Sequence, residues 1–538
     1  MLFDRVPIAL LLLLLGLVQH EPRTRAQVFT TPVELDKITA HSISTNTQSL
    51  LLSLPSTPRP VVLSVELCTQ VDGQNPPRFF ALANTASSTT RQTSSQTSTT
   101  TASTPSITPV ANSQELDVSG GVGYWNSVKS LDNGGILQVI LPPGATGGPW
   151  RFSVGLSTNE PLHWRSERTP LFGDSTSTSA LLFSPPIPNT ASDFVEPTFP
   201  KYELPDKNLS SPSAPTEATS TNNTLVVFPT SLLINDDGQF KTELTSSACY
   251  LQSLEASTNT TGSLNIATRL VLRNQEEGWR TQHIVQGLNP STNYTFYVMS
   301  TFGNQVLLSQ PAFFKTKRDG FPCTLAHSLP FCPSVAYSVP FPPLTGTPST
   351  YDASNFPSQL QETLFNSLGN FTSSLKTFAC GRDLYSIVQS CASCERAYRT
   401  WLCSTLVPRC GEVDESLLPP AAIVPRVVGS TNTTATSARV DQTVLGSSAV
   451  GSYSELLPCL ETCHAVDRAC PPTLNWRCPR KGITAERSYG VGFIDKEGDD
   501  VSGGGQEGAG RTGRSQDPYG NVWCNRMTTN DRITMNKT

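Results

Sequence analysis

Long hydrophobic segments are scarce in this sequence. Residues 8–18 form one unbroken apolar stretch, and no later run reaches about eighteen residues, the length that a membrane-spanning helix needs. The final residues, 532–538, are mostly polar, so the hydrophobic end of a lipid-anchor signal is also absent. If the protein works at a membrane, we therefore expect a protein partner to hold it there.

Charge is also sparse. Only 15% of the 538 residues are charged, the net charge is -5, and no dense basic cluster occurs. Binding to the nucleic-acid backbone depends on clustered Lys and Arg side chains. We therefore predict no nucleic-acid partner.

Histidine is rare, and this argues against several kinds of catalytic or metal site. With only six histidines, no Ser/His/Asp arrangement is favoured, and no pair of catalytic carboxylates can be identified. The pair Cys391 and Cys394 could form half of a zinc or redox site, with Cys459, Cys463 and His464 as the nearest second half. Structural disulfides explain these cysteines better. We predict no catalytic residue, no cofactor and no metal site.

One acidic turn, residues 495–500, invites a calcium-loop interpretation. It fails the EF-hand pattern because Asp500 stands at position six instead of glycine and Gln506 at position twelve instead of glutamate. A solvated acidic loop is the better interpretation.

The short apolar stretch at residues 8–18 is typical of a signal peptide covering residues 1–26, with Ala26 at the cleavage point. Retention of this segment as an anchor is the alternative. A signal peptide sends the chain through the secretory pathway, where an oxidising lumen favours disulfides. The candidate disulfide cysteines are Cys68, Cys249, Cys323, Cys332, Cys380, Cys391, Cys394, Cys403, Cys410, Cys459, Cys463, Cys470, Cys478 and Cys524.

Twelve of these fourteen cysteines lie between Cys323 and Cys524. Cys68 and Cys249 stand apart and could pair with each other, which would join two regions of the chain. The sequence leaves the rest of the connectivity open.

Asn-x-Ser/Thr sequons predict surface glycans on a secreted chain. The candidates for N-glycosylation are Asn208, Asn222, Asn259, Asn293, Asn370, Asn432 and Asn536.

The N-terminal half of the chain has the pattern of antiparallel β-sandwich-like domains. Residues 27–204 contain alternating, β-branched segments at 60–68, 78–84, 135–142 and 150–156, interrupted by a Ser/Thr-rich insert at about 85–113 that we expect to be disordered. Residues 205–222 form a linker. Residues 223–317 contain further strand patterns, and the order of Leu288, Pro290 and Tyr294 resembles the corner of a fibronectin type III domain.

The pattern changes to helical spacing after Cys323. Apolar residues recur every three or four positions over 360–378, 384–402 and 456–470, with Pro458 placed at a first helical turn and Gly381 between the first two helices. We predict a disulfide-rich, mainly α-helical cysteine-rich domain at 318–480 with a loop insertion at about 411–453. A Gly-rich tail at 481–538, ending near Cys524, follows it. The fold class is therefore multidomain α+β.

Four segments of the predicted helical domain carry a resemblance. They are 391–394 (CASC), 401–410 (WLCSTLVPRC), 458–463 (PCLETC) and 470–478 (CPPTLNWRC), and together they resemble a Frizzled-type cysteine-rich domain. With the signal peptide, the glycosylated β-rich half and residues 519–525 (YGNVWCN), the chain resembles the fungal stretch-activated calcium channel regulatory component family. The specific motifs cover about residues 320–538.

That resemblance implies a non-enzymatic auxiliary subunit. Its expected partner is the pore-forming four-repeat voltage-gated-type calcium channel subunit, which the cysteine-rich domain would contact on its extracellular loops. The implied role is support of calcium influx that is activated by stretch, pheromone or stress. The implied location is the extracellular face of the plasma membrane, with the endoplasmic reticulum membrane as a second place. Because the sequence shows no spanning segment beyond the signal peptide, we do not expect it to form a pore itself.

Two other functions fit parts of the sequence. A Frizzled-like module could hold a lipid or peptide ligand. A wall-associated enzyme or glycan-binding protein could use aromatic residues such as Trp125 or Trp150 to stack on sugars, although both have strand-like contexts that favour packing in a core.

Overall fold

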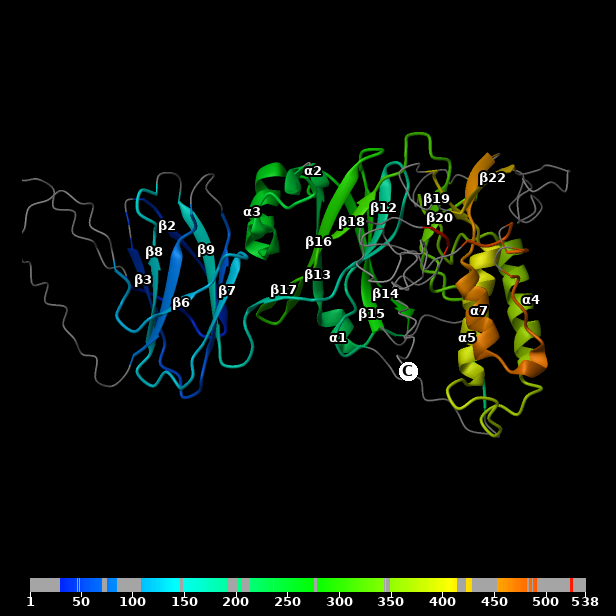
Figure 1. Cartoon of the computed structure of the whole chain (residues 1–538), viewed down its shortest axis with the longest axis horizontal. Helices are drawn as coiled ribbons and strands as arrows, with labels where there is room; N and C mark the ends of the chain where they lie inside the picture. The colour runs from blue at the N-terminus through cyan, green and yellow to red at the C-terminus, as the bar shows by residue number, and fades with distance from the viewer. Residues whose placement is uncertain are drawn as a thin grey trace, which may run out of the picture.

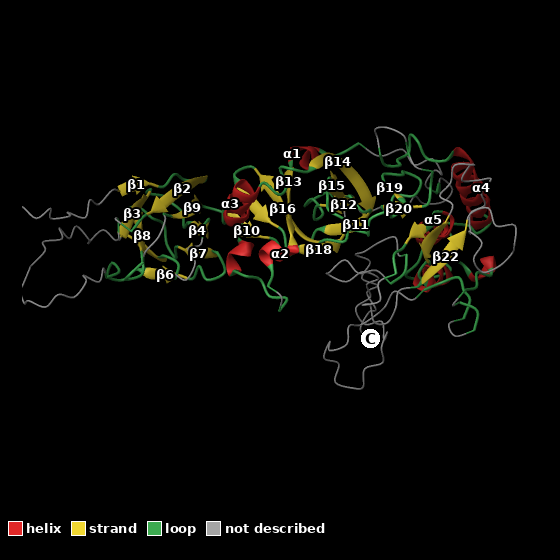
Figure 2. Ribbon diagram, turned by 90° about the horizontal axis from the view of Figure 1, so that it is seen from above, coloured by secondary structure: helices red, strands yellow, loops and turns green. Residues whose placement is uncertain are grey.

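The computed structural model describes residues 30–45, 47, 49–69, 75–84, 108–145, 149–190, 202–204, 213–235, 237–274, 278–342, 344, 349–413, 422–427, 452–480, 483–485, 487–490 and 523–525. The predicted signal peptide, most of the Ser/Thr-rich insert, the acidic turn at 495–500 and the sequons at Asn208, Asn432 and Asn536 lie outside these residues. The described elements follow one another along the long axis of the molecule in three groups (Figures 1 and 2). We call them the first β unit (30–157), the middle β unit (163–315) and the cysteine-rich region (323–525).

Two sheets pack together in the first β unit. One has the strand order β1-β3-β8-β5-β6 and the other β2-β9-β4-β7. The core between them contains Phe79, Phe152 and Trp150, all at most 2% exposed. The strands are β1 (Thr30–Pro32), β2 (Lys37–Ile43), β3 (Ser49–Leu54), β4 (Val62–Leu67), β5 (Arg78–Ala83), β6 (Gln114–Leu116), β7 (Val122–Asn126), β8 (Gly135–Ile140) and β9 (Trp150–Ser157). The four segments predicted as strands correspond to β4, β5, β8 and β9, because their alternation places every second side chain in this core.

The middle β unit also contains two sheets, ordered β10-β17-β16-β13 and β11-β12-β15-β14, with β18 also paired to β16. Side chains of both sheets share one core. Helices α2 and α3 cover the other face of the first sheet. The strands are β10 (His163–Arg165), β11 (Leu171–Ser175), β12 (Ser179–Phe183), β13 (Asn222–Pro229), β14 (Asn265–Asn274), β15 (Gly278–Gln286), β16 (Asn293–Phe302), β17 (Gln305–Leu308) and β18 (Ala312–Lys315), and the helices are α1 (Thr216–Ser220), α2 (Thr230–Leu233), the 3-10 helix η1 (Glu243–Ser246) and α3 (Ala248–Thr258).

The predicted boundary at residue 204 does not coincide with these sheets. Strands β10, β11 and β12 precede it in the chain, yet β10 pairs with β17 and β12 pairs with β15. The predicted linker, 205–222, thus lies between strands of one unit, and its described part contains α1 and the first residue of β13. The β10–β17 and β1–β3 pairings are parallel, so the sheets are mixed and not purely antiparallel.

The corner predicted around Tyr294 is present in the middle β unit. Tyr294 is 4% exposed, and its hydroxyl accepts a hydrogen bond from the backbone N–H of Asn289 at 2.9 Å. Its ring stacks on Phe314, with 5.4 Å between the ring centroids. The hydroxyl therefore ties the turn before β16 to the core.

The cysteine-rich region combines three helices with short strands. Helix α5 (Cys391–Leu406) packs against both α4 (Ser358–Leu375) and α7 (Leu460–Ala469). Strands β19 (Thr324–Ala326) and β20 (Tyr337–Val339) pair with each other, and β21 (Arg409–Cys410), β23 (Ser452–Leu456) and β22 (Ile423–Val427) form a second sheet. A 3-10 helix, η2 (Pro472–Leu474), follows α7. The helices stand at the opposite end of the molecule from the first β unit (Figure 1).

Three predictions for this region differ from the structure. Strand β22 lies inside the stretch predicted as a loop insertion, because its short β-branched segment pairs with β23. The helix predicted from residue 384 begins only at Cys391, where the side chain of Ser390 accepts a hydrogen bond from the N–H of Ser393 and caps the helix. Pro458 precedes the N-cap residue Cys459 and so stands just before the first turn of α7.

Within the described residues, no helix is both long enough and apolar enough to cross a membrane.

Candidate functional site

All fourteen cysteines are in disulfides, so none of them is a metal ligand or a redox thiol in this structure. The pairs are Cys68–Cys249, Cys323–Cys410, Cys332–Cys403, Cys380–Cys391, Cys394–Cys470, Cys459–Cys524 and Cys463–Cys478. One cluster of metal-ligand type, formed by Cys459, Glu461 and Cys524, occurs among the described residues. Because both sulfur atoms are already bonded to each other, this cluster offers one carboxylate and does not fit a metal ion.

Helix α5 organises the disulfide framework of the cysteine-rich region. Its Cys391 bonds to Cys380 after α4, its Cys394 to Cys470 after α7, and its Cys403 to Cys332 before α4. Each such bond typically contributes about 2–5 kcal/mol to the stability of a small domain. The framework thus holds the loops around α5 in fixed positions.

The loop between Cys380 and Cys391 displays apolar side chains to solvent. Leu384, Ile387 and Val388 are 83%, 95% and 77% exposed. The disulfide Cys380–Cys391 closes this loop at its base. We call residues 381–390 the clamped loop.

The base of the clamped loop is tied down while its apolar side chains remain exposed. The hydroxyl of Tyr385 donates a hydrogen bond to the carbonyl oxygen of Ala469 at 2.7 Å, and its ring packs edge-on against Phe378. Arg382 and Asp383 form an ion pair with each other at 2.9 Å. Exposed apolar side chains that are concentrated on one held segment are typical of a contact surface.

The sequence pattern assigned the three apolar residues of this loop to the buried face of a helix, and that interpretation is wrong. Their spacing is helical, but helix α5 begins only after them, at Cys391, where Ser390 caps its N-terminus and Cys391 is bonded to Cys380. Their exposure could not be recognised from spacing alone.

A buried carboxylate joins the middle β unit to the cysteine-rich region. Oδ2 of Asp174, on β11, accepts hydrogen bonds from Nε of Arg409 at 2.9 Å and from N and Oγ of Ser338 at 3.2 and 3.1 Å. Nζ of Lys317 lies 3.8 Å from Oδ1. Burial alone would raise the pKa of Asp174, but the charges of Arg409 and Lys317 and the hydrogen bonds outweigh burial and lower it. The charged carboxylate therefore fixes how these two parts meet.

A second joint links the first and middle β units. The disulfide Cys68–Cys249 connects the end of β4 to α3, and the Ser247 hydroxyl donates to the carbonyl oxygen of Leu67 at 2.6 Å. Beside it, Oε1 of Glu66 accepts a hydrogen bond from the N–H of Ala248 at 2.5 Å. One covalent bond and two hydrogen bonds thus link the two units at one place.

Glu66 also lies next to a buried histidine, in an arrangement that superficially resembles a hydrolase triad. Nδ1 and Nε2 of His163 lie 2.9 Å from the hydroxyls of Ser64 and Ser153, and Nε2 lies 3.7 Å from Oε2 of Glu66. Burial raises the pKa of Glu66 to about 7 and lowers the pKa of His163 to about 4. All four residues are at most 4% exposed, so no substrate can reach them. The cluster is structural.

The sequons that the structure describes are at the surface. Asn222, Asn259, Asn293 and Asn370 are all exposed. Each therefore has room for a glycan. Their glycosylation remains a prediction.

Comparison with known proteins identifies the family of this chain. A family model described as Mid1, stretch-activated Ca²⁺-permeable channel component, matches residues 60–502. The chain is 36% identical over 402 residues to the stretch-activated cation channel MID1 of Cryptococcus neoformans, covering 69% of this chain and 61% of that protein. It is 26% identical over 280 residues to the stretch-activated cation channel yam8 of Schizosaccharomyces pombe, covering 50% of this chain and 53% of that protein.

A third relative is the stretch-activated cation channel MID1 of Saccharomyces cerevisiae, 29% identical over 216 residues, covering 38% of this chain and 36% of that protein. The matched parts therefore span less than two thirds of the length of these relatives. The family consists of channel components and is not an enzyme family. The family model spans most of this chain, and the chain therefore belongs to the Mid1 family of stretch-activated Ca²⁺-permeable channel components.

Proposed function

We propose that this protein is a non-enzymatic, extracellular regulatory subunit of a plasma-membrane calcium channel. It supports calcium influx that is activated by stretch, pheromone or stress. Its partner is the pore-forming subunit, a four-repeat channel of the voltage-gated type, and that partner holds it at the membrane. The protein passes through the secretory pathway, and the endoplasmic reticulum membrane is a second place where it can act.

The cysteine-rich region is the part that we propose contacts the pore-forming subunit, and the clamped loop is the observation that carries this. Exposing three apolar side chains to water is unfavourable in free energy, and contact with a partner would remove this surface from water. Burying each side chain at an interface contributes about 1.5–3 kcal/mol. The disulfide at its base limits the ordering that binding must impose.

The test replaces Leu384, Ile387 and Val388 together by serine in the full chain. The tagged protein is purified from fungal membranes in mild detergent, and the co-purifying pore subunit and cellular calcium uptake are measured. We expect co-purification to fall at least about tenfold, since losing even one buried side chain of this size weakens binding that much. Ile483→Ser is the matched control, because Ile483 is an exposed apolar residue of the same region, 75% exposed.

Unchanged co-purification and uptake in the triple variant would remove the clamped loop from the proposal. Recovery of the unmodified protein only as a channel-free species in the medium would overturn the auxiliary-subunit function. Deletion of residues 320–538 and Cys403→Ser serve as broader tests, because Cys403→Ser breaks the bond that holds Cys332.

A Frizzled-like ligand-binding module is the second candidate function. It is supported by the sequence motifs of the cysteine-rich region. Lipid that co-purifies with the full chain, in place of a channel, would favour it.

A further inference from the structure

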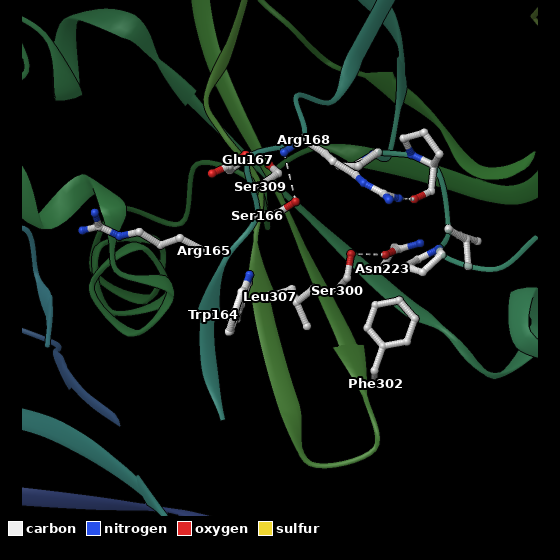
Figure 3. Close-up of a pocket in the computed structure, with 14 residues that line it drawn as sticks. Trp164, Arg165, Ser166, Glu167, Arg168, Asn223, Ser300, Phe302, Leu307 and Ser309 are labelled. Atoms are coloured by element: carbon white, nitrogen blue, oxygen red, sulfur yellow. Dashed lines mark hydrogen bonds between the residues drawn. The ribbon is translucent and has the colours of Figure 1, made fainter. Parts of the chain in front are cut away.

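A groove of about 430 Å³ opens in the middle β unit (Figure 3). None of its lining residues belongs to the clamped loop. One wall is formed by β10, β17 and β16. The segment 185–188, which follows β12, forms the facing wall. The groove thus lies where the two sheets continue beyond their shared core.

Four lining side chains form one row across the first of these sheets. Trp164 on β10 pairs with Leu307 on β17, Leu307 pairs with Ser300 on β16, and Ser300 pairs with Asn223 on β13. Register partners point to the same face of a sheet, and neighbouring strands are about 4.8 Å apart, so the row is about 14 Å long. One end of the row is aromatic and the other is polar.

The aromatic end is an indole left open to solvent. Trp164 is 44% exposed, although further along the sheet the same face forms the core through Val298 and Phe296. In contrast, Trp125 and Trp150, which the sequence suggested as sugar-stacking candidates, are only 6% and 2% exposed. An accessible flat ring beside the apolar Leu307 is suited to the C–H face of a ligand.

The polar end is held in place by hydrogen bonds. The hydroxyl of Ser300 donates to Oδ1 of Asn223 at 2.5 Å (Figure 3). Nδ2 of Asn223 in turn donates to Oγ1 of Thr281 at 2.6 Å. An amide nitrogen carries a second hydrogen and a hydroxyl oxygen has acceptor sites beyond the proton it donates. These two side chains therefore present a fixed donor and acceptor to the groove.

The rim carries no excess of one charge. Glu167 and Arg168 both line the groove, and Nη1 of Arg168 donates to the carbonyl oxygen of Pro186 at 3.1 Å, which braces the facing wall. Arg165 points away, and its guanidinium bonds to the carbonyl oxygen of Gly120 in the first β unit (Figure 3). A neutral ligand fits this balance better than an anion.

We propose that this groove binds a neutral oligosaccharide of hexose units. One sugar ring stacks on the indole of Trp164, and the hydroxyls of the next units bond to Ser300 and Asn223. A hexose ring has an apolar C–H face and hydroxyl groups around its edge. The indole and the leucine side chain match the apolar face, and the serine hydroxyl and the asparagine amide match the hydroxyls. The site is independent of the proposed contact with a channel.

The test uses the full secreted chain, enzymatically stripped of its own N-glycans, and isothermal titration with a β-1,3-linked glucose hexamer and a mannose hexamer. We expect saturable binding of one of them, with an affinity that falls about tenfold or more in Trp164→Ala and about threefold to tenfold in Ser300→Ala. Phe240→Ala is the matched control, because Phe240 is an aromatic residue of the same unit with similar exposure, 37%, and it does not line the groove. Unchanged thermal midpoints show that the variants fold.

Absence of saturable binding for both hexamers at concentrations on the order of millimolar would overturn the proposal. Binding that survives Trp164→Ala would do the same, because it would place the saccharide elsewhere. If a proline-rich peptide binds, neither hexamer binds, and the peptide loses affinity in Trp164→Ala, the groove is a peptide site and the saccharide proposal is refuted.

Discussion

The carboxylate of Asp174 joins the middle β unit to the cysteine-rich region, and replacing it by an amide tests that joint. Asp174→Asn keeps the shape and one oxygen for Ser338 but removes the charge that pairs with Arg409 at 2.9 Å. The two side chains are 1% and 6% exposed, so water cannot replace the lost partner. Removing one member of a buried ion pair typically costs about 3–5 kcal/mol.

We expect a loss near the lower end of that range, about 3 kcal/mol, because the amide oxygen preserves part of the hydrogen bonding. For a unit of about 150–250 residues this lowers the thermal midpoint by about 6–12 °C, which calorimetry at pH 7 measures. The pKa of Asp174 is lowered, so its contribution is present above its unfolded pKa of 3.8 and is lost as the pH falls below that value. The difference between the proteins should therefore shrink in acid.

Two further variants make the reasoning refutable. Glu115→Gln breaks an exposed ion pair with Arg78 and should cost less than about 1 kcal/mol. The double variant Asp174→Asn/Arg409→Met removes both charges and should be more stable than Asp174→Asn alone, because no charge is left buried without a partner. A single variant within about 1 kcal/mol of the unmodified protein, or a double variant that is less stable than the single one, would contradict the proposed role of the joint.

Three other predictions concern stability. Burial raises the pKa of Glu66 from 4.5 to about 7, so the Glu66 contribution to stability falls by about 3 kcal/mol as the pH rises from 4.5 to 7, while the lowered pKa of His163 acts in the opposite direction. Urea unfolding of Glu66→Gln should lack the Glu66 contribution, and pH slopes equal to those of the unmodified protein would refute it. Replacing Cys68 and Cys249 together by alanine should cost about 2–5 kcal/mol in calorimetry, and an unchanged midpoint would contradict the joint that they form. Tyr294→Phe removes one buried hydrogen bond and should cost about 0.5–1.5 kcal/mol in urea unfolding, whereas no loss would show that the corner does not stabilise the turn.

Local patterns in the sequence predicted many of the elements. Alternating β-branched residues located β4, β8 and β9, and helical spacing located α4 and α7, because these signals depend on which side of one element is buried. The corner at Tyr294 could also be predicted, since its donor, Asn289, is only five residues away. In each case the information lies within a short stretch of chain.

The elements and contacts that were not predicted depend on distant partners. The strand β12 was assigned to the wrong unit because its partner β15 lies about 100 residues later, beyond a Ser- and Pro-rich excursion. Asp174 and Arg409 are 235 residues apart, so nothing near either residue signals the joint. The exposed clamped loop was missed because α5 begins only at Cys391, after the cap at Ser390, although the apolar spacing extends back to Leu384.

The candidate surfaces were predicted only in outline. The motifs of the cysteine-rich region indicated where a partner contact should lie, but not that the clamped loop would carry it. Trp164 was overlooked in favour of Trp125 and Trp150, because the exposure of an aromatic residue depends on where the facing sheet ends. The spacing of residues in the sequence carries no information about where the facing sheet ends.

The order of the disulfides along the chain has a consequence for biosynthesis. Cys68 must wait for a partner that is made 181 residues later, about 9–36 s at typical rates of about 5–20 residues per second. Cys332 is synthesised next after Cys323, yet Cys323 pairs with Cys410 and Cys332 pairs with Cys403. If Cys323 and Cys332 paired with each other as they were synthesised, a non-native disulfide would form. Correct folding therefore requires that these thiols stay reduced, or that an isomerase exchanges the bond, until α5 has formed.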